Sequence, residues 1–296
     1  MKQYFILAAA ALTLAACSND ENSNIVENSE LISLSAAIGT TTRATLTDAE
    51  AQNTQFASGK SIFVEAYKKD VTTTYTTGQY TANGSGGLTG SLYYPATGEN
   101  IDICAYYPSS VSSSTASFSV GATQTTAANY QSYDLMYATK LTNKAKGSTH
   151  ALTFNHALSK IIVTIAAGNG VTADNISNLV SAVKINNTKL TGTVSITGGA
   201  ISVTGVTGDA TDIDITGTTK TSHAGIIVPQ QVAAGVFITV TYNGQNYTYS
   251  LDANKTFVAG YVYTYALTLS AQGLSLGSTT INNWTAGEGA TPSITL

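Results

Sequence analysis

Apolar and polar residues alternate in many short segments of this chain, and glycine or asparagine turns separate most of these segments. The clearest pair is Val236–Tyr242 and Gln245–Leu251, which flank Asn243-Gly244. A period of two is typical of strands with one buried face, and Asn-Gly favours the tight turn of a β-hairpin. The pattern therefore predicts an all-β fold.

The composition agrees with strands and excludes several kinds of function. Charged residues make up 10% of the 296 residues, against about 25% in an average soluble domain. The net charge is −4 and no basic patch is present, so we expect no binding of nucleic acid. With only 3 His and 2 Cys, the chain has few ways to build a metal site or a nucleophilic triad. We expect no cofactor and no enzymatic activity.

The N-terminus has the pattern of an export signal. A basic start precedes the apolar run Tyr4–Ala16, which is too short to span a bilayer. The run ends in Leu14-Ala15-Ala16-Cys17, which looks like a bacterial lipobox. It predicts cleavage between Ala16 and Cys17 and acylation of Cys17, for example with palmitate; the alternative is an ordinary signal peptide that contains a cysteine. Several acyl chains would hold the protein at a membrane, and Cys104 would have no partner for an intramolecular disulfide.

The first expected strand covers Glu30–Ile38. Its period of two places four apolar side chains on one face: Ile32, Leu34, Ala36 and Ile38. Further along, the apolar stretch Ile161–Ile165 predicts a buried central strand, and Asp174–Val183 predicts a short helix.

Many short strands at roughly regular spacing indicate β-sandwiches. The composition shifts near Asn143–Ser148, a stretch rich in Lys, Gly and Ser. We therefore expect two domains, at residues 44–147 and 148–296.

Two motifs suggest chemistry only weakly. Gly273–Gly277 matches the G-x-S-x-G nucleophile elbow around Ser275, but no helix is expected after it and the last histidine, His223, lies upstream. Asp212–Gly217 loosely matches a calcium loop, but its alternation also predicts a strand with exposed carboxylates. We favour a turn between strands for the first motif and a strand for the second.

Histidine and tyrosine residues offer two further candidate sites. His156 enters the apolar strand without a cysteine or carboxylate cluster beside it in the sequence, which favours a structural role. Tyrosines that could stack on sugars more often pack at the edges of sheets. They are Tyr93, Tyr94, Tyr106, Tyr107, Tyr261, Tyr263 and Tyr265.

Arg43 is the only arginine, since 12 of the 13 basic residues are lysines. It follows the first strand within a run of threonines. Either this position is due to chance, or Arg43 marks a processing site for an Arg-specific protease in an exposed loop.

A set of short motifs follows in order along nearly the whole chain. They are the lipobox ending at Cys17, Thr-Thr-Thr-Arg-Ala at 40–44, Tyr-Tyr-Pro at 93–95, Asp-Ile-Cys-Ala-Tyr-Tyr-Pro at 102–108, Asp-Leu-Met-Tyr-Ala at 134–138, Leu-Thr-Phe-Asn-His-Ala-Leu-Ser-Lys-Ile at 152–161, Ile-Ile-Val-Pro-Gln at 226–230, Ala-Gly-Tyr-Val-Tyr at 259–263 and Ile-Asn-Asn-Trp at 281–284. In these motifs the chain resembles the fimbrillin family of surface lipoproteins, the type V pilins of certain Gram-negative bacteria.

The resemblance implies two tandem β-sandwich domains of transthyretin-like topology and delivery to the outer membrane as a lipoprotein. Residues 1–16 would be the signal peptide, and residues 17–43 a lipidated propeptide that carries the first strand. A trypsin-like or gingipain-like, Arg-specific protease would cut between Arg43 and Ala44. Subunits would then join with other fimbrial subunits by donor-strand exchange at the groove left by Ile32, Leu34, Ala36 and Ile38.

The resemblance leaves the donor strand and the place in the fimbria open. The tail has a period of two at Ala290, Pro292, Ile294 and Leu296, but Pro292 removes a hydrogen-bond donor; the other candidate is Ser275–Trp284. A stalk subunit donates a strand, whereas a tip subunit need not. The alternative function is a permanently anchored surface lipoprotein, an adhesin that binds a host glycan or host protein.

Overall fold

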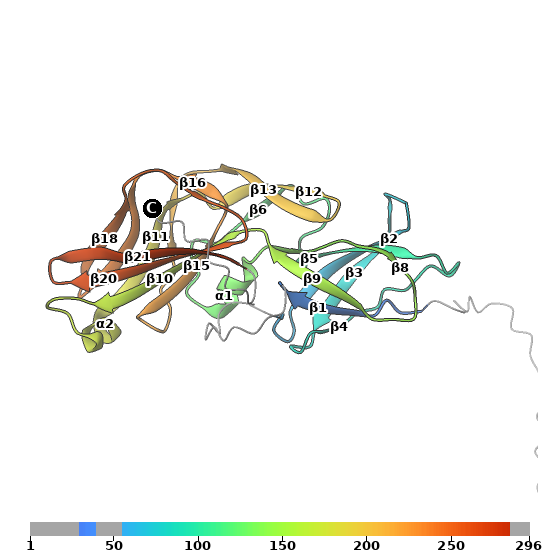
Figure 1. Ribbon diagram of the computed structural model, residues 1–296, viewed down its shortest axis with the longest axis horizontal. Helices are drawn as coiled ribbons and strands as arrows, with labels where there is room; N and C mark the ends of the chain where they lie inside the picture. Colours follow the sequence, from blue (N-terminus) through green and yellow to red (C-terminus); the bar gives the residue numbers. More distant parts are fainter. Residues whose placement is uncertain (1–29, 40–54, 285–296) are drawn as a thin grey trace, which may run out of the picture.

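The computed structural model describes residues 30–39 and 55–284. The molecule is elongated, and two groups of strands follow one another along its long axis (Figure 1). Strands dominate the described residues, and both helices are short. The all-β fold class is therefore confirmed. None of the helices in these residues is long and apolar enough to cross a bilayer.

Eight strands of the N-terminal half form one sheet with the order β2-β3-β4-β1-β9-β7-β5-β8. Their bounds are β1 Leu34–Ile38, β2 Ser61–Lys68, β3 Thr74–Ala82, β4 Gly87–Thr89, β5 Ile101–Tyr107, β7 Met136–Ala138, β8 Leu141–Lys144 and β9 His150–His156.

This sheet closes on itself, because β2 also pairs with β5. The pairings run from β2 through β3, β4, β1, β9, β7 and β5 back to β2, and β8 pairs with the amino end of β5. We call the closed part the ring. A closed sheet has no free edge, so removing any one strand would create two.

The remaining elements form four smaller sheets with the orders β15-β10-β20-β21, β14-β11-β17-β18, β13-β12-β6 and β16-β19. Their bounds are β6 Ser117–Ser119, α1 Ala127–Ser132, β10 Ser159–Ala167, α2 Ala173–Leu179, β11 Val180–Thr188, β12 Thr191–Thr197, β13 Ala200–Thr207, β14 Thr211–Asp214, β15 Ser222–Ile227, β16 Gln230–Val232, β17 Gly235–Tyr242, β18 Gln245–Leu251, β19 Lys255–Phe257, β20 Tyr261–Ser270 and β21 Gly273–Asn283.

Buried apolar side chains form two clusters. The smaller cluster belongs to the ring and to the residues beside it, and includes Ile32, Phe56, Tyr80 and Phe154. The larger cluster lies mainly between the sheets of the C-terminal half and includes Ile161, Phe237 and Tyr265.

Local sequence patterns correctly predicted several elements. β17 and β18 form a hairpin through Asn243 and Gly244, whose φ values of 48° and 75° fit the expected tight turn. Strand β10 lies between β15 and β20 and buries Ile161, Val163 and Ile165. The expected short helix is α2, with Thr172 as its N-cap, but it ends at Leu179 and not at Val183, because Val180 begins strand β11.

The expected domain division after residue 147 stays a prediction. The first strand beyond that point, β9, pairs with β1 and β7 of the ring. The pairings of the ring therefore extend past this position in the sequence.

Candidate functional site

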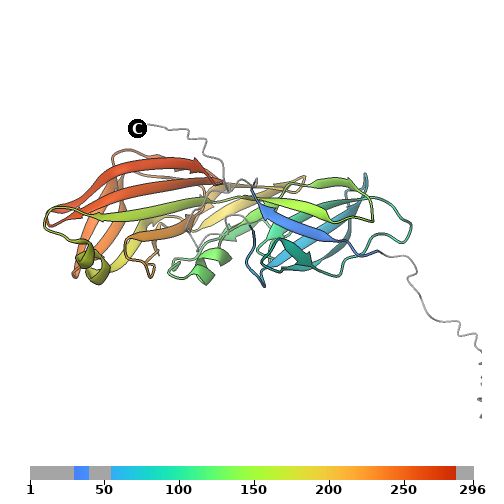
Figure 2. The same ribbon diagram turned by 60° about the horizontal axis from the view of Figure 1, so that its bottom comes forward.

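Strand β1 lies between β4 and β9 in the ring (Figure 2, where β1 is blue). It runs antiparallel to β4, with Leu34 opposite Leu88, and parallel to β9, with Leu34 opposite His150 and Ile38 opposite Phe154. We call residues 30–39 the first segment. It closes the ring between two strands that follow it in the sequence.

The first segment points its apolar face into the core. Ile32 and Ile38 are fully buried, Leu34 is 2% exposed and Ala36 is 5% exposed. The residues between them are exposed or half-buried. Ala36 is the smallest of the four, so the groove that receives the segment has three large apolar positions and one small one.

Backbone hydrogen bonds attach the first segment along its length. The Ile32 amide donates to the Leu92 carbonyl at 2.8 Å, and the Gly39 amide donates to the Phe154 carbonyl at 2.9 Å. At the beginning of the segment, the Glu30 carboxylate accepts a hydrogen bond from the Gly147 amide at 2.6 Å. The segment is therefore bound as a full member of the sheet.

Tyr80 of β3 holds the first segment from inside the core. Its hydroxyl donates to the Ile32 carbonyl at 2.8 Å, and the side chain is 1% exposed. Glycine at position 90 leaves space for the phenol side chain of Tyr80, because a Cβ at Gly90 would lie 2.5 Å from Tyr80 Cγ. Burial raises the pKa of Tyr80 to about 12, since the ionised phenolate loses its hydration.

Replacing Tyr80 by phenylalanine is expected to weaken the attachment of the first segment. The Ile32 carbonyl would lose this partner, which costs about 1–3 kcal/mol for a buried group. Denaturant unfolding of the uncut chain measures the change. Tyr75→Phe is the matched control, because Tyr75 lies on the same strand and is 39% exposed.

The same residue predicts a dependence on pH. Because the pKa of Tyr80 is raised from 10 to about 12 in the folded protein, its neutral phenol contributes fully to stability below about pH 10. That contribution is lost as the pH rises from about 10 to about 12, because the phenol ionises more readily in the unfolded chain. The Tyr80→Phe variant should therefore lose less stability than the wild type between pH 9 and pH 11. An equal loss in both proteins would contradict this role of Tyr80.

The other residues of the predicted processing lie outside the described residues. They are Ala16 and Cys17 of the lipobox, and Arg43 and Ala44 of the predicted protease site.

The weak chemical motifs do not form reactive sites. Ser275 lies inside β21, opposite Thr268, and not on a strand-to-helix turn. Asp212 lies in β14 as expected, and the neighbouring Asp214 carboxylate accepts hydrogen bonds from Thr216. Within the described ranges, no group of three or more His, Cys, Asp or Glu side chains could hold a metal ion.

His156 has a carboxylate partner that sequence analysis missed. Its Nδ1 lies 2.8 Å from Oδ1 of Asp134, and both side chains are almost completely buried. The pairing of β7 with β9 places Met136 opposite His156 and so brings Asp134 close. Because no substrate could reach this buried pair, it is a structural contact.

Most of the candidate sugar-binding tyrosines pack in the core. Tyr93 is 47% exposed and Tyr261 is half-buried. The others are buried: Tyr94, Tyr106, Tyr107, Tyr263 and Tyr265. They form no shared aromatic surface.

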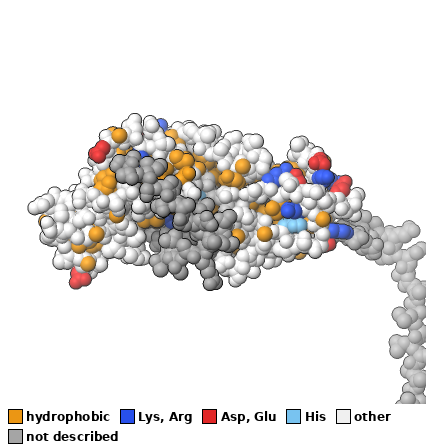
Figure 3. All heavy atoms as spheres, viewed as in Figure 1, with side chains coloured by type: hydrophobic (Ala, Val, Ile, Leu, Met, Phe, Trp, Pro, Cys, Tyr) orange, Lys and Arg blue, Asp and Glu red, His pale blue; other side chains and the backbone are white. Residues whose placement is uncertain are grey.

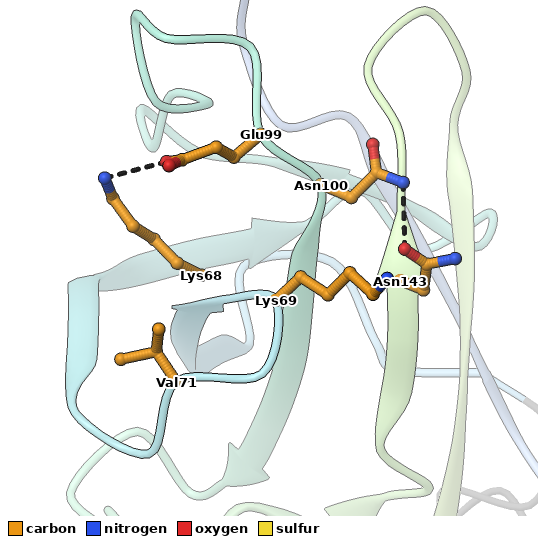
Figure 4. A pocket seen from close by; sticks show the side chains of 6 residues that line it. All are labelled: Lys68, Lys69, Val71, Glu99, Asn100 and Asn143. Atoms are coloured by element: carbon orange, nitrogen blue, oxygen red, sulfur yellow. Dashed lines mark hydrogen bonds and ion pairs between the residues drawn. The ribbon is translucent and has the colours of Figure 1, made fainter.

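A shallow pocket lies at the end of the ring, beside the turn after β2 (Figure 4). Four of its polar side chains form pairs: Lys68 with Glu99 at 2.7 Å, and Asn100 with Asn143 at 2.9 Å. Charges of both signs gather at this end of the molecule (Figure 3). Such exposed, mutually paired groups form no catalytic arrangement.

Comparison with known proteins identifies relatives along almost the whole chain. The family model described as fimbrillin-like matches residues 42–284. Fim1C of Bacteroides uniformis, named as a candidate fimbrium subunit, is 28% identical over 312 aligned positions, which cover 98% of this chain and 97% of the relative.

Solved structures with a similar fold also align with most of the chain. A candidate cell adhesion protein of Bacteroides uniformis aligns with a TM-score of 0.66 and 27% identity, covering 86% of this chain and 99% of the other. The tip fimbrial protein Mfa3 of Porphyromonas gingivalis shares the fold, with a TM-score of 0.51, 10% identity and coverage of 86% and 99%. The family model covers well over half of the residues, and the chain belongs to the fimbrillin-like family.

Proposed function

We propose that this protein is a structural subunit of a surface fimbria, made as a lipoprotein precursor. Its acyl chains on Cys17 would hold the precursor at the outer membrane. An Arg-specific protease would cut after Arg43, and the protein would then join other fimbrial subunits by donor-strand exchange. The proposal includes two tandem β-sandwich domains of transthyretin-like topology.

The burial of β1 within the ring is the observation that carries this proposal. Burying an Ile or Leu side chain contributes about 1.5–3 kcal/mol, so Ile32, Leu34 and Ile38 together contribute about 5–9 kcal/mol. A whole domain is stable by only about 5–15 kcal/mol. Loss of the first segment would leave an apolar groove and two unpaired edges, on β4 and β9. Such edges recruit another strand.

The order of features along the chain fits this mechanism. The lipobox cysteine comes first, then the first segment, then the only arginine, and then the rest of the ring. One cut after Arg43 would separate both the lipid and the first segment from the body. The uncut precursor would not assemble early, because its own strand fills the groove.

The groove restricts the strand that could replace β1. The incoming strand would need large apolar side chains at the places of Ile32, Leu34 and Ile38, and a small side chain at the place of Ala36. The candidate donors in this chain are the tail at Ala290–Leu296 and the segment Ser275–Trp284. A tip subunit need donate neither.

A second candidate function is a permanently anchored adhesin. It is favoured by the similarity to a candidate cell adhesion protein of Bacteroides uniformis. In that case the protein at the cell surface would keep its lipid and its first segment.

The N-terminal residue of the surface-exposed protein distinguishes the two functions. We expect a free Ala44 in assembled material, measured by N-terminal sequencing or mass spectrometry of purified fimbriae. A lipidated Cys17 on all surface-exposed copies would contradict the processing model and support the anchored adhesin.

A further inference from the structure

Trp284 is the last described residue of the chain. Its side chain packs where the ring meets the C-terminal sheets, beside His156 of β9 and Lys160 of β10. Its side chain is 5% exposed. Its ring stacks on the imidazole of His156, with the two ring centroids 3.8 Å apart and the planes within 6° of parallel. The Trp284 amide also donates to the Gly260 carbonyl at 2.6 Å.

The strand that leads to Trp284 is held only weakly by side chains. β21 pairs with β20 alone and is an edge of its sheet. None of its own side chains is fully buried, whereas those of β20 alternate between buried and half-buried. Trp284 is thus the one buried side chain among the described residues after Leu269. It is the most deeply buried side chain near the end of β21, where Ile281 is only partly buried against the same cluster.

The partners of Trp284 come from both halves of the molecule. His156 belongs to the ring and is oriented by Asp134, 2.8 Å away. Lys160 of β10 places its Nζ 6.0 Å from the Trp284 ring centroid and 5.6 Å from that of Tyr130, within the range of cation–π attraction. We call Asp134, His156, Lys160 and Trp284 the junction cluster.

The junction cluster carries an energetic cost. The indole Nε1 of Trp284 is buried and has no hydrogen-bond partner within the described ranges. A buried donor without a partner favours the state in which water can reach it. The closed position of Trp284 is therefore opposed by the hydration of its own N–H group.

Strand β9 connects the junction cluster to the first segment. β1 pairs with β9 up to Phe154, and Gly39 donates to the Phe154 carbonyl. His156 follows two residues later at the end of the same strand. With β1 present, β9 has a neighbour on each side; without β1, only β7 remains.

We propose that Trp284 is a latch that holds the end of β21 against the ring, and that its closure is coupled through β9 to the presence of the first segment. Departure of β1 would loosen the end of β9 that orients His156, and the latch would open more often. The biological use of this coupling rests on the proposed function, whereas the coupling itself is a property of the uncut chain.

The stacking on His156 can be tested by fluorescence, because Trp284 is the only tryptophan in the chain. In the uncut wild type, we expect little quenching by acrylamide. His156→Ala should raise the quenching constant several-fold and shift the emission to longer wavelengths. His223→Ala is the matched control and should leave the quenching unchanged, since His223 is a buried histidine on β15, outside the ring. Equal quenching in wild type and His156→Ala would overturn the latch.

Hydrogen exchange tests the coupling in the uncut chain. Because coupling between two sites is reciprocal, Trp284→Ala should speed amide exchange by about threefold or more in residues 30–39 and 150–156 as well as in β21. Trp284→Phe, which keeps an aromatic ring, should change exchange less.

Faster exchange confined to β21 would overturn the coupling. If Trp284→Ala does not fold, the same exchange measurement on His156→Ala decides the question. Neither measurement uses a protease, so failure of the coupling is distinct from failure of the processing, which the N-terminal residue of the fimbriae reports.

Discussion

Replacing Arg43 by alanine is expected to produce folded, lipidated monomers that do not assemble. The chain contains no other arginine, so an Arg-specific protease would have no site. The first segment would remain in the ring and no groove would open. Stable oligomer ladders on gels of mildly denatured samples, and fibres in electron micrographs, measure assembly; we expect both to fall below detection.

Arg43→Lys is the matched control for this experiment. It keeps the positive charge but removes the arginine, so it should also block an Arg-specific protease and should be rescued by trypsin. Fibres of normal length and number from cells that make only Arg43→Ala would refute processing at this position.

Replacing Ile32 by aspartate is expected to destabilise the precursor severely and to leave the cut protein unchanged. Ile32 is fully buried, so the variant loses an apolar contact and places a carboxylate in the core. An unpaired buried charge costs several kcal/mol. We expect a fall in the melting temperature of about 10 °C or more for the uncut chain.

Ser33→Asp is the control, because the adjacent Ser33 side chain is exposed and its replacement should change the melting temperature by no more than about 2 °C. After cleavage and removal of residues 17–43, the wild type and both variants have the same sequence and should melt alike. An unchanged melting temperature of uncut Ile32→Asp would mean that the first segment contributes little to the fold.

Sequence patterns predicted those features that depend on neighbouring residues. The hairpin at Asn243-Gly244 follows from the turn preference of two adjacent residues, and the short helix α2 lies within the stretch where the sequence predicts a helix. The apolar run from Ile161 to Ile165 correctly predicts the buried strand β10. These signals are local, so they are readable without knowledge of the fold.

Contacts between distant residues could not be predicted in this way. Nothing near His156 in the sequence identifies Asp134 or Trp284 as its partners. Tyr80 is one of 17 tyrosines, and no local pattern separates it from the others as the residue that holds Ile32. These contacts depend on which strands become neighbours.

The sequence by itself determined that residues 32–38 have one apolar face, and that this face lies between the lipobox-like motif at residues 14–17 and the only arginine. Only the tertiary structure decided that the segment closes a ring between β4 and β9, parallel to one and antiparallel to the other. The physical reason is that alternation depends on the residues within a strand. The choice of neighbouring strands depends on the packing of the whole core.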